Sequence, residues 1–580
     1  MEGIRQLHLI DFFVIGFYFT IIAVAGNYLS KYIKDAKDYF TAGGNLPWWL
    51  AGISFWMTGF SALSFVVYSE MIYKYGLTAI TIYIVGAPAL FIGGYFFAGK
   101  WRRARQVSPI GFVERRFSPS LKQIFIWTGI PLRVLDNGLR IYATAVFLTV
   151  AISNESITFT GLVWATGIFM IFYSFLGGQF AVVITDFVQF ILIFLVVSFV
   201  FPLAVNDVGG FSKIFEIPDK FALLAPPYDI FQLVTVFLLL LIAYNAGWGL
   251  IQKYNCVRTD KDAKKVAYSL GVLNLITPFL FFAPALFAII PFPELENPRF
   301  AYIYMGIKVL PVGLVGVLFS AMLSATMSSL ASEYNTISGV VTNDFYKKKI
   351  NKDASDKQLI FVGRINTILI GLLTTLFAYS IQFMTGMNLF DIMIKAFTAF
   401  APAIMLPLLA GLLFKKVNSK GAYAGIVAGF VSGSIFLLLN IILVGMYNEQ
   451  FVSNSQLNYW LNQGWSSGSI LLNISITSLA LYLGSKFGEI SDDEKRRTEE
   501  FFKLMDTPYV AEKKATSISP FPAIGITLSV IGIGFAITAF VVEYMFERQD
   551  WLWLNLLAAL IFILLGGSMW YFSKRKEFAG

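Results

Sequence analysis

Small hydroxyl side chains are concentrated in one apolar stretch of the chain. The run from Ala325 to Ser332 reads Ala-Thr-Met-Ser-Ser-Leu-Ala-Ser, and polar residues continue through Glu333 to Thr336. The interior of a bilayer offers no oxygen atoms, so these hydroxyl groups would supply the ligands that a hard cation such as Na⁺ requires. The run therefore predicts a cation site within a membrane-spanning helix.

Charged side chains inside apolar stretches form the second set of candidates, because each is costly at mid-membrane without a partner or water. Arg133, Asp136 and Arg140 are spaced by three and four residues, so they share one face of a helix. Asp186 and Lys395 lie in other apolar stretches. Mutual neutralisation is one interpretation of such groups. The other is that a surplus cation, Arg140 or Lys395, meets an anionic group of a ligand.

Several kinds of chemistry are disfavoured by what the sequence lacks. One histidine, His8, and one cysteine, Cys256, cannot build a His/Cys metal cluster, a Cys–His nucleophile or a disulfide within one chain. The sequence has no phosphate-binding Walker loop, so ATP is not the expected energy source. Asp136 and Asp186 have no context that indicates a proton-sharing catalytic pair. We therefore expect no enzyme, and coupling to an ion gradient is the natural alternative.

The elements that must position these residues are membrane helices. The chain is 57% hydrophobic and 14% charged, which is not the composition of a soluble globular protein. Hydropathy predicts an all-α polytopic membrane protein with about fifteen transmembrane helices of roughly twenty residues each. The predicted spans are 8–29, 47–69, 77–98, 124–152, 159–176, 181–203, 231–252, 266–291, 311–341, 359–384, 388–413, 420–445, 470–485, 521–545 and 551–572.

Lysine and arginine fall in every second predicted loop. The loops 100–122, 253–265, 347–357 and 415–420 are basic, whereas 446–469 carries no cation. The positive-inside rule therefore predicts a multi-pass protein of the cell membrane with its N-terminus outside and its C-terminus in the cytoplasm. The net charge of +9 then reflects the basic cytoplasmic loops, and no nucleic-acid partner is expected.

Helix-breaking residues occur at corresponding places in two halves of the chain. Gly59 interrupts the span 47–69, and Gly247 interrupts 231–252, five spans later. Close helix packing explains any single glycine of this kind. A pair of discontinuous helices instead exposes backbone groups that bind ions and substrate near the middle of the membrane. The pairing therefore favours a secondary transporter.

Four motifs, in order, resemble the sodium:solute symporter family, and together they extend over nearly the whole chain. They are Gly43-Gly44-Asn45-Leu46-Pro47-Trp48-Trp49; Gly177-Gly178 with Ala181-Val182, Thr185-Asp186 and Gln189; Ser328 to Ser332 with Asn335 and Thr342-Asn343-Asp344-Phe345-Tyr346; and Gly411 to Ala422.

The resemblance implies a core of two inverted five-helix repeats with broken first and sixth core helices. The implied domains are an extra N-terminal helix at 1–30, a first repeat at 45–204, a second repeat at 231–414, and C-terminal accessory helices at 420–580. A cytoplasmic loop, 486–516, lies within the last of these, and its charged part is either an amphipathic surface segment or a solvated linker.

The resemblance also implies a Na⁺ site at which the broken first core helix meets the eighth. Carried onto this sequence, its ligands are Met57 O, Phe60 O, Ala325 O, Ser328 Oγ and Ser329 Oγ. Five oxygens suit a hard cation. The structural alternative for the two serines is a hydrogen bond back to the preceding turn of their own helix.

A second Na⁺ site, present in some family members, would use Asp186 and hydroxyls of the eighth core helix. Ser332 matches one of these hydroxyl positions, but Ala331 stands where two-sodium members have a hydroxyl residue. We therefore expect one Na⁺ per cycle, with Asp186 steering ions or bonding Ser332.

The substrate contacts implied by the resemblance are less well matched. Ser64, Tyr83 and Asn274 stand where sugar-transporting members have Gln, Glu and Lys, so the galactose-type contact set is not reproduced. Arg140 lies in the region from which sialic acid members bring an arginine to the substrate carboxylate, and Lys395 stands where sugar transporters have a Gln. These two favour a solute with a carboxylate over a neutral sugar. The candidate substrate-binding residues are Ser61, Ser64, Tyr83, Arg140, Tyr244, Asn274 and Lys395.

The function expected from these observations is Na⁺-coupled symport of a small polar organic solute into the cell by alternating access. The solute would be a sugar, an acidic sugar such as sialic acid, or another organic acid. A transporter-derived channel or sensor and a proton-coupled carrier are the alternatives. The expected partners are this small-molecule substrate, Na⁺ and the lipid bilayer, and the sequence carries no signal of oligomeric state.

Overall fold

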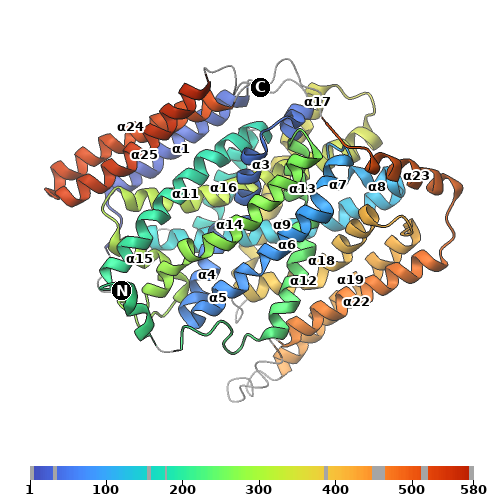
Figure 1. The fold of residues 1–580 in the computed structure, drawn as a ribbon, viewed down its shortest axis with the longest axis horizontal. Coiled ribbons are helices and arrows are strands. Elements are labelled where there is room, and N and C mark those ends of the chain that lie inside the picture. Colours follow the sequence, from blue (N-terminus) through green and yellow to red (C-terminus); the bar gives the residue numbers. More distant parts are fainter. Residues whose placement is uncertain are drawn as a thin grey trace.

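The computed structural model shows an all-helical protein (Figure 1). Beside the helices, the described residues contain two isolated β-bridges. The structure describes residues 5–30, 36–152, 158–176, 179–217, 219–383, 389–446, 461, 464–510 and 520–573.

The helices correspond to the predicted spans. Within the described ranges, twelve helices are long and apolar enough to cross a membrane, two further spans are bent helix pairs, and Phe159–Phe175 is a shorter apolar helix. The prediction of an all-α polytopic membrane protein is therefore confirmed. The helices of the predicted core are α3 (Trp48–Gly59), α4 (Ala62–Tyr75), α5 (Leu77–Ile84), α6 (Gly86–Gly93), α7 (Gly99–Arg103), α9 (Pro119–Ala151), α10 (Phe159–Leu176), α11 (Gln179–Asp207), α12 (Ile230–Ala246), α13 (Trp248–Cys256), α14 (Asp260–Phe287), α16 (Leu314–Val340), α17 (Asp356–Ile381) and α18 (Leu389–Leu413).

Helix α16 forms the centre of the molecule, and all of its residues are buried. Its glycines allow neighbouring segments to approach closely. A Cβ atom at Gly316 would lie 2.5 Å from the carbonyl oxygen of Asp11, and one at Gly339 would lie 2.8 Å from Cδ1 of Phe40. The hydroxyl-rich run predicted to bind a cation therefore lies in the most enclosed helix of the fold.

Two membrane spans are broken, as the sequence predicts. Helices α3 and α4 meet at an angle of 61°, and α12 and α13 meet at 48°. Phe60 follows α3 with extended backbone angles, and Gly247 separates α12 from α13 in the same way. The hydrogen-bond ladder of each span is interrupted there, so backbone groups are left for other partners.

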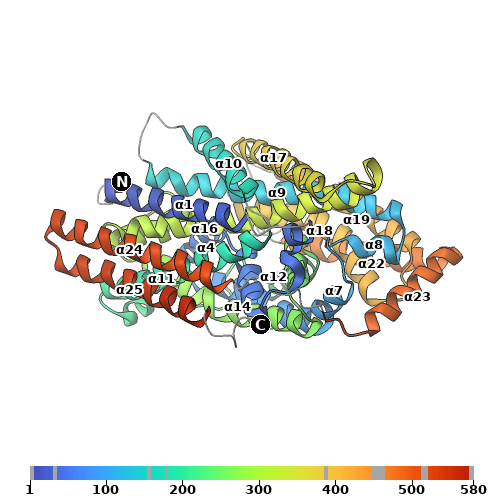
Figure 2. The ribbon, with the colours of Figure 1, turned by 90° about the horizontal axis from the view of Figure 1, so that it is seen from above.

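The remaining transmembrane helices flank the core on two sides (Figures 1 and 2). On one side, α24 (Phe521–Phe546) and α25 (Gln549–Ser573) form a hairpin next to α1 (Leu9–Ser30). On the other side, α19 (Ser419–Met446) and α22 (Trp465–Phe487) pack against α18. The helix α15 (Ala301–Val309) is a short element between α14 and α16.

The segments predicted to be cytoplasmic lie together at one end of the bundle. Arg103 forms an ion pair with Asp260 and donates a hydrogen bond to Met505 O, and Lys122 pairs with Asp344 at 2.6 Å. The charged part of loop 486–516 forms the amphipathic helix α23 (Asp492–Asp506), which packs on α8 (Gly111–Arg116). This part of the loop is therefore a docked surface helix, as one of the two interpretations predicted, whereas 511–516 lies outside the described residues.

Candidate functional site

The break between α3 and α4 faces the hydroxyl-rich part of α16. Phe60 N donates to Met57 O at 3.3 Å, which closes the end of α3. Across the gap, Ala62 N at the start of α4 donates to Thr326 Oγ1 at 3.1 Å. Because Thr326 directly follows Ala325, the structure brings the expected cation ligands of α3 and α16 into one neighbourhood.

The two expected serine ligands are buried and already hydrogen bonded. Ser328 Oγ donates to Asp186 Oδ1 at 2.5 Å, and Ser329 Oγ donates to Thr326 O at 3.0 Å, a bond within its own helix. A hydroxyl that donates its proton keeps its oxygen lone pairs for another partner. Both hydroxyls therefore fit the role of cation ligands in this arrangement.

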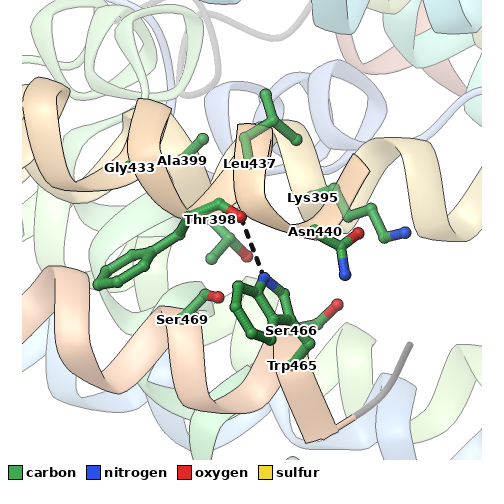
Figure 3. A pocket seen from close by; sticks show the side chains of 10 residues that line it. Lys395, Thr398, Ala399, Gly433, Leu437, Asn440, Trp465, Ser466 and Ser469 are labelled. Atoms are coloured by element: carbon green, nitrogen blue, oxygen red, sulfur yellow. Dashed lines mark hydrogen bonds between the residues drawn. The ribbon is translucent and has the colours of Figure 1, made fainter. Parts of the chain in front are cut away.

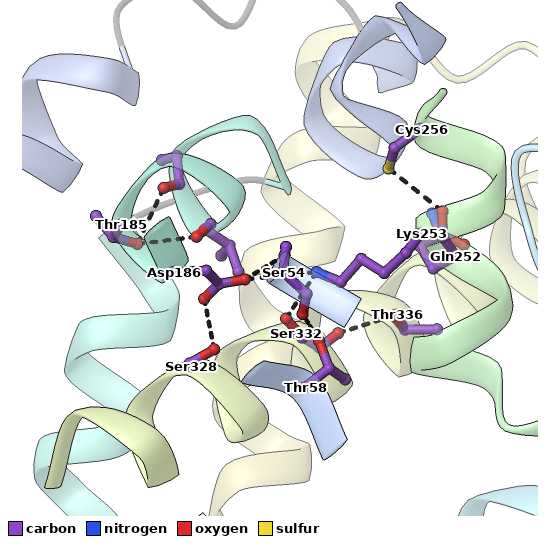
Figure 4. Close-up of polar contacts among 12 residues, drawn as sticks. Ser54, Thr58, Thr185, Asp186, Gln252, Lys253, Cys256, Ser328, Ser332 and Thr336 are labelled. Carbon is purple, nitrogen blue, oxygen red and sulfur yellow. Dashed lines mark hydrogen bonds and ion pairs between the residues drawn. The ribbon is translucent and has the colours of Figure 1, made fainter. Parts of the chain in front are cut away.

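Asp186 joins three elements at this site (Figure 4). Its carboxylate accepts hydrogen bonds from Ser328 of α16 and from Ser54 of α3. Lys253 of α13 places its Nζ 3.7 Å from Asp186 Oδ2 and donates to Ser332 Oγ at 2.9 Å. Of the two expected roles of Asp186, steering ions or bonding Ser332, the second takes an indirect form here, because Lys253 lies near Asp186 and donates to Ser332.

Lys253 is the residue of this site that the sequence interpretation missed. The predicted span 231–252 ends before it, which places Lys253 in the basic loop 253–265. In the structure α13 continues to Cys256, and Lys253 is fully buried. The break at Gly247 was the available signal: a new half-helix beginning there requires about two further turns to cross the protein interior, and these turns include Lys253.

The charges of α9 also lie close to the cation site. Arg140 donates to Thr58 O and to Asp136 Oδ2, both at 2.9 Å. Arg133 lies 3.4 Å from Glu333 Oε2. These contacts match the predicted mutual neutralisation. Within the described residues, Arg140 Nε is buried without a hydrogen-bond partner, so part of its donor capacity is available.

A small cavity lies beside the break in α3. Its lining includes Phe60, Tyr83, Tyr244 and Asn274, all predicted site residues. Its volume is about 30 Å³, room for about two water molecules. Gly86 makes the local packing possible, since a Cβ atom there would lie 2.8 Å from the Tyr244 ring and 3.1 Å from Asn274 Nδ2.

Four other predicted substrate residues do not line this cavity, and one of them is Arg140, whose contacts are given above. Ser61 precedes α4, and its carbonyl accepts from Ser64 N at 2.9 Å, so both belong to the helix break. Lys395 lines a separate cavity between α18, α19 and α22, with Asn440 and Trp465 among its neighbours (Figure 3). The structure therefore does not bring Lys395 to the central cavity.

The site combines two broken helices with a buried cluster of hydroxyl, carbonyl and carboxylate oxygens and a small cavity beside them. This combination is typical of an ion-coupled secondary transporter. The oxygen ligands suit a hard monovalent cation. Among the residues that the structure describes, no cluster of His, Cys, Asp and Glu suits a transition metal.

Comparison with known proteins identifies the kind of transporter. The model of the Sodium:solute symporter family matches residues 39–429, more than half of the chain. The sodium/glucose cotransporter of Vibrio parahaemolyticus is 29% identical, covering 73% of this chain and 84% of that protein. The sodium/sialic acid symporter of Aliivibrio fischeri is 26% identical, covering 72% and 85%. The chain belongs to the sodium:solute symporter family.

The solved structures agree with this assignment. The chain is similar to a Na⁺-coupled sialic acid symporter described in a substrate-bound, outward-open state with a novel Na⁺ site. The TM-score is 0.64 at 21% identity, over 81% of this chain and 98% of that one. This likeness confirms the expected fold of two inverted repeats. The protein is thus a multi-pass, Na⁺-coupled solute symporter and not an enzyme.

Proposed function

We propose that this symporter carries a small, polar, uncharged organic solute of the sugar class into the cell with one Na⁺ per cycle. The observation that carries the proposal is the position of the α3–α4 break, which lies between the hydroxyls of α16 and the central cavity. A cation bound at the break is therefore adjacent to a solute bound in the cavity, and each would stabilise the site of the other.

Na⁺ in this proposal is held by Met57 O, Phe60 O, Ala325 O, Ser328 Oγ and Ser329 Oγ. These five positions come from one broken helix and one continuous helix, so the bound ion ties α3 to α16. Release would follow when the two helices separate during rocking of the repeats. Each unit charge that moves inward down 100 mV contributes about 2.3 kcal/mol to the transport cycle.

The lining of the central cavity supports an uncharged solute. Aromatic side chains such as Trp56, Tyr83 and Tyr244 line it together with Asn274, and no charged residue does so in the described part of the chain. Aromatic faces stack on sugar rings, and an amide hydrogen bonds with hydroxyl groups. The relatives transport glucose or sialic acid, according to their names, which supports the same broad class.

An acidic solute is the second candidate, and Arg140 favours it. Its Nε has no hydrogen-bond partner among the described residues, and its guanidinium contacts Thr58 O next to the proposed cation ligand Met57. A carboxylate could displace one of its present contacts. Lys395 is the other residue on which the prediction of a carboxylate rests. It lines the separate cavity between α18, α19 and α22 and therefore does not support an acidic solute at the central cavity.

The orientation in the membrane is part of the proposal. We place the N-terminus outside and the C-terminus in the cytoplasm, because the basic segments contact one another at one end of the bundle. The contacts of Arg103 with Asp260, and of Lys122 with Asp344, support this arrangement. The boundaries 45–204 and 231–414 remain our proposal for the two repeats.

Uptake into proteoliposomes tests the proposal. The panel contains radiolabelled neutral hexoses, sialic acid and short carboxylates, each tested with an inward Na⁺ gradient, an inward proton gradient or neither. We expect uptake of a neutral sugar driven by Na⁺ and weakened by Asn274→Ala. Na⁺-driven uptake of acids alone, lost in Arg140→Gln, would instead establish the second candidate. Uptake driven by protons and indifferent to Na⁺ would contradict both.

A further inference from the structure

We infer that the ammonium group of Lys253 is a built-in cation at the position where a second Na⁺ would bind, and that it limits this symporter to one Na⁺. The inference rests on the proposed Na⁺ site and deepens it. Ala331 weakens a second site by removing one oxygen, whereas Lys253 fills the site that the remaining oxygens form.

The oxygens around Lys253 form a ligand set of the kind that Na⁺ uses. Asp186 contributes a carboxylate, and Ser54, Ser328 and Ser332 contribute hydroxyls from α3 and α16. All four side chains are buried. A carboxylate with several hydroxyls, enclosed and away from lipid, is a suitable environment for a hard cation.

Lys253 occupies this set from a third element. Its Nζ donates to Ser332 Oγ at 2.9 Å and lies 3.7 Å from Asp186 Oδ2, and the side chain is fully buried (Figure 4). A Na⁺ that contacted both Asp186 and Ser332 would have to lie within a few ångströms of the ammonium. Two like charges this close in a buried site repel strongly, so the ion and the lysine exclude one another.

The charge balance of the neighbourhood agrees with one ion. Asp186 is balanced by Lys253, Glu333 faces Arg133, and Asp136 faces Arg140. Each buried carboxylate thus has a cationic neighbour before any Na⁺ arrives. The proposed site at Ser329 uses uncharged hydroxyl and carbonyl oxygens, so a single Na⁺ adds one charge there without disturbing these pairs.

Lys253 also lies on a broken helix, so its contacts link that helix to its neighbours. It connects α13 to α11 through Asp186 and to α16 through Ser332. A Na⁺ at the same place would connect only the elements that supply its oxygens, and it would leave during each cycle. The lysine stays with the protein, so this link contributes no ion to the driving force.

Equilibrium binding of ²²Na⁺ to the purified full-length protein at pH 8 tests the inference without any organic solute. We expect one Na⁺ per chain in the wild type and two in Lys253→Met, because the freed oxygens then accept an ion. Lys253→Arg, which keeps the charge, is the matched control and should bind one. The double variant Lys253→Met with Asp186→Asn should return to one.

The outcomes separate this inference from the proposed function. Two ions bound by the wild type, or one ion bound by a folded Lys253→Met, would overturn the inference. Lys253→Gln serves as a second neutral variant if Lys253→Met does not fold, and the wild-type count needs no variant. A wild type that binds no Na⁺ would overturn the proposed Na⁺ site itself.

Discussion

Ser328 Oγ donates a 2.5 Å hydrogen bond to Asp186 Oδ1, which joins the central helix α16 to α11 at the cation site. The bond fixes where the hydroxyl proton points. The lone pairs of the serine oxygen are then left for a cation, so a residue outside the expected ligand set of the Na⁺ site prepares one of its ligands.

Asp186→Asn should therefore weaken Na⁺ activation of transport. A hydrogen bond to a charged group contributes about 1.5 to 3 kcal/mol, which corresponds to a loss of roughly tenfold to a hundredfold in apparent Na⁺ affinity. The Na⁺ dependence of uptake measures it. Ser324→Ala is the control, because Ser324 is buried in the same helix and bonds Tyr18 instead. An equal effect of both variants would show that Asp186 has no special relation to the ion.

Gly86→Ala should reduce solute affinity more than Na⁺ affinity. The new methyl group would lie 2.8 Å from the Tyr244 ring and 3.1 Å from Asn274 Nδ2, so both must shift within the central cavity. We expect a rise in the KM for solute of about tenfold, equivalent to about 1.4 kcal/mol. Gly16→Ala, where nothing lies within 4 Å of the new Cβ, should leave uptake unchanged. An unchanged KM in Gly86→Ala would place the solute elsewhere.

Arg140→Gln should destabilise the protein because it leaves Asp136 without its cation. The pair is largely buried, with side-chain exposures of 12% and 14%, and loss of one partner of a buried pair costs about 3 to 5 kcal/mol. Thermal unfolding in detergent measures the change. Adding Asp136→Asn removes the unpaired charge and should restore much of the stability. A double variant that is no more stable than Arg140→Gln would mean that the Thr58 contact, not the pair, is what matters.

Arg116→Ala should release α23 from the core. Arg116 is fully buried, and its guanidinium donates to Thr498 of α23 at 2.6 Å and to Lys415 O at 3.0 Å. Without it the buried Thr498 hydroxyl and the Lys415 carbonyl lose their donor. Hydrogen exchange of residues 492–506 should become faster by at least tenfold. Lys495→Ala, which breaks an exposed ion pair with Asp492, should change it little. Similar protection in both variants would contradict the docking role of Arg116.

The membrane helices were predictable because hydropathy is a local property that the bilayer imposes on about twenty consecutive residues. The breaks at Gly59 and Gly247 were predictable for a similar reason, since they are visible as glycines within apolar spans. The directions of buried side chains were not predictable, because tertiary packing sets them. Lys253 is the clearest case, because a cation near the end of a span is usually a loop residue, whereas Lys253 is buried in α13, beyond the bend at Gly247.

The substrate contacts show the same limit. Tyr83, Tyr244 and Asn274 come from three helices and Phe60 comes from the α3–α4 break, and the structure places them around one cavity. Lys395 lies on α18 and lines a cavity with residues of α19 and α22, which lie outside the two repeats that we propose. Spacing along one helix does not reveal which neighbouring helix a side chain meets.

In the proposed mechanism, a Na⁺ held at the α3–α16 contact drives solute uptake. The most direct test measures uptake of the transported solute into proteoliposomes under an inward Na⁺ gradient. The test compares the Ser329→Ala variant with the Ser320→Ala variant. Both serines are buried in α16 and donate to carbonyls of their own helix, but Ser320 lies away from the break. We predict that Ser329→Ala abolishes Na⁺-driven uptake and that Ser320→Ala retains it. Equal uptake in the two variants, or uptake that does not respond to Na⁺, would contradict the account.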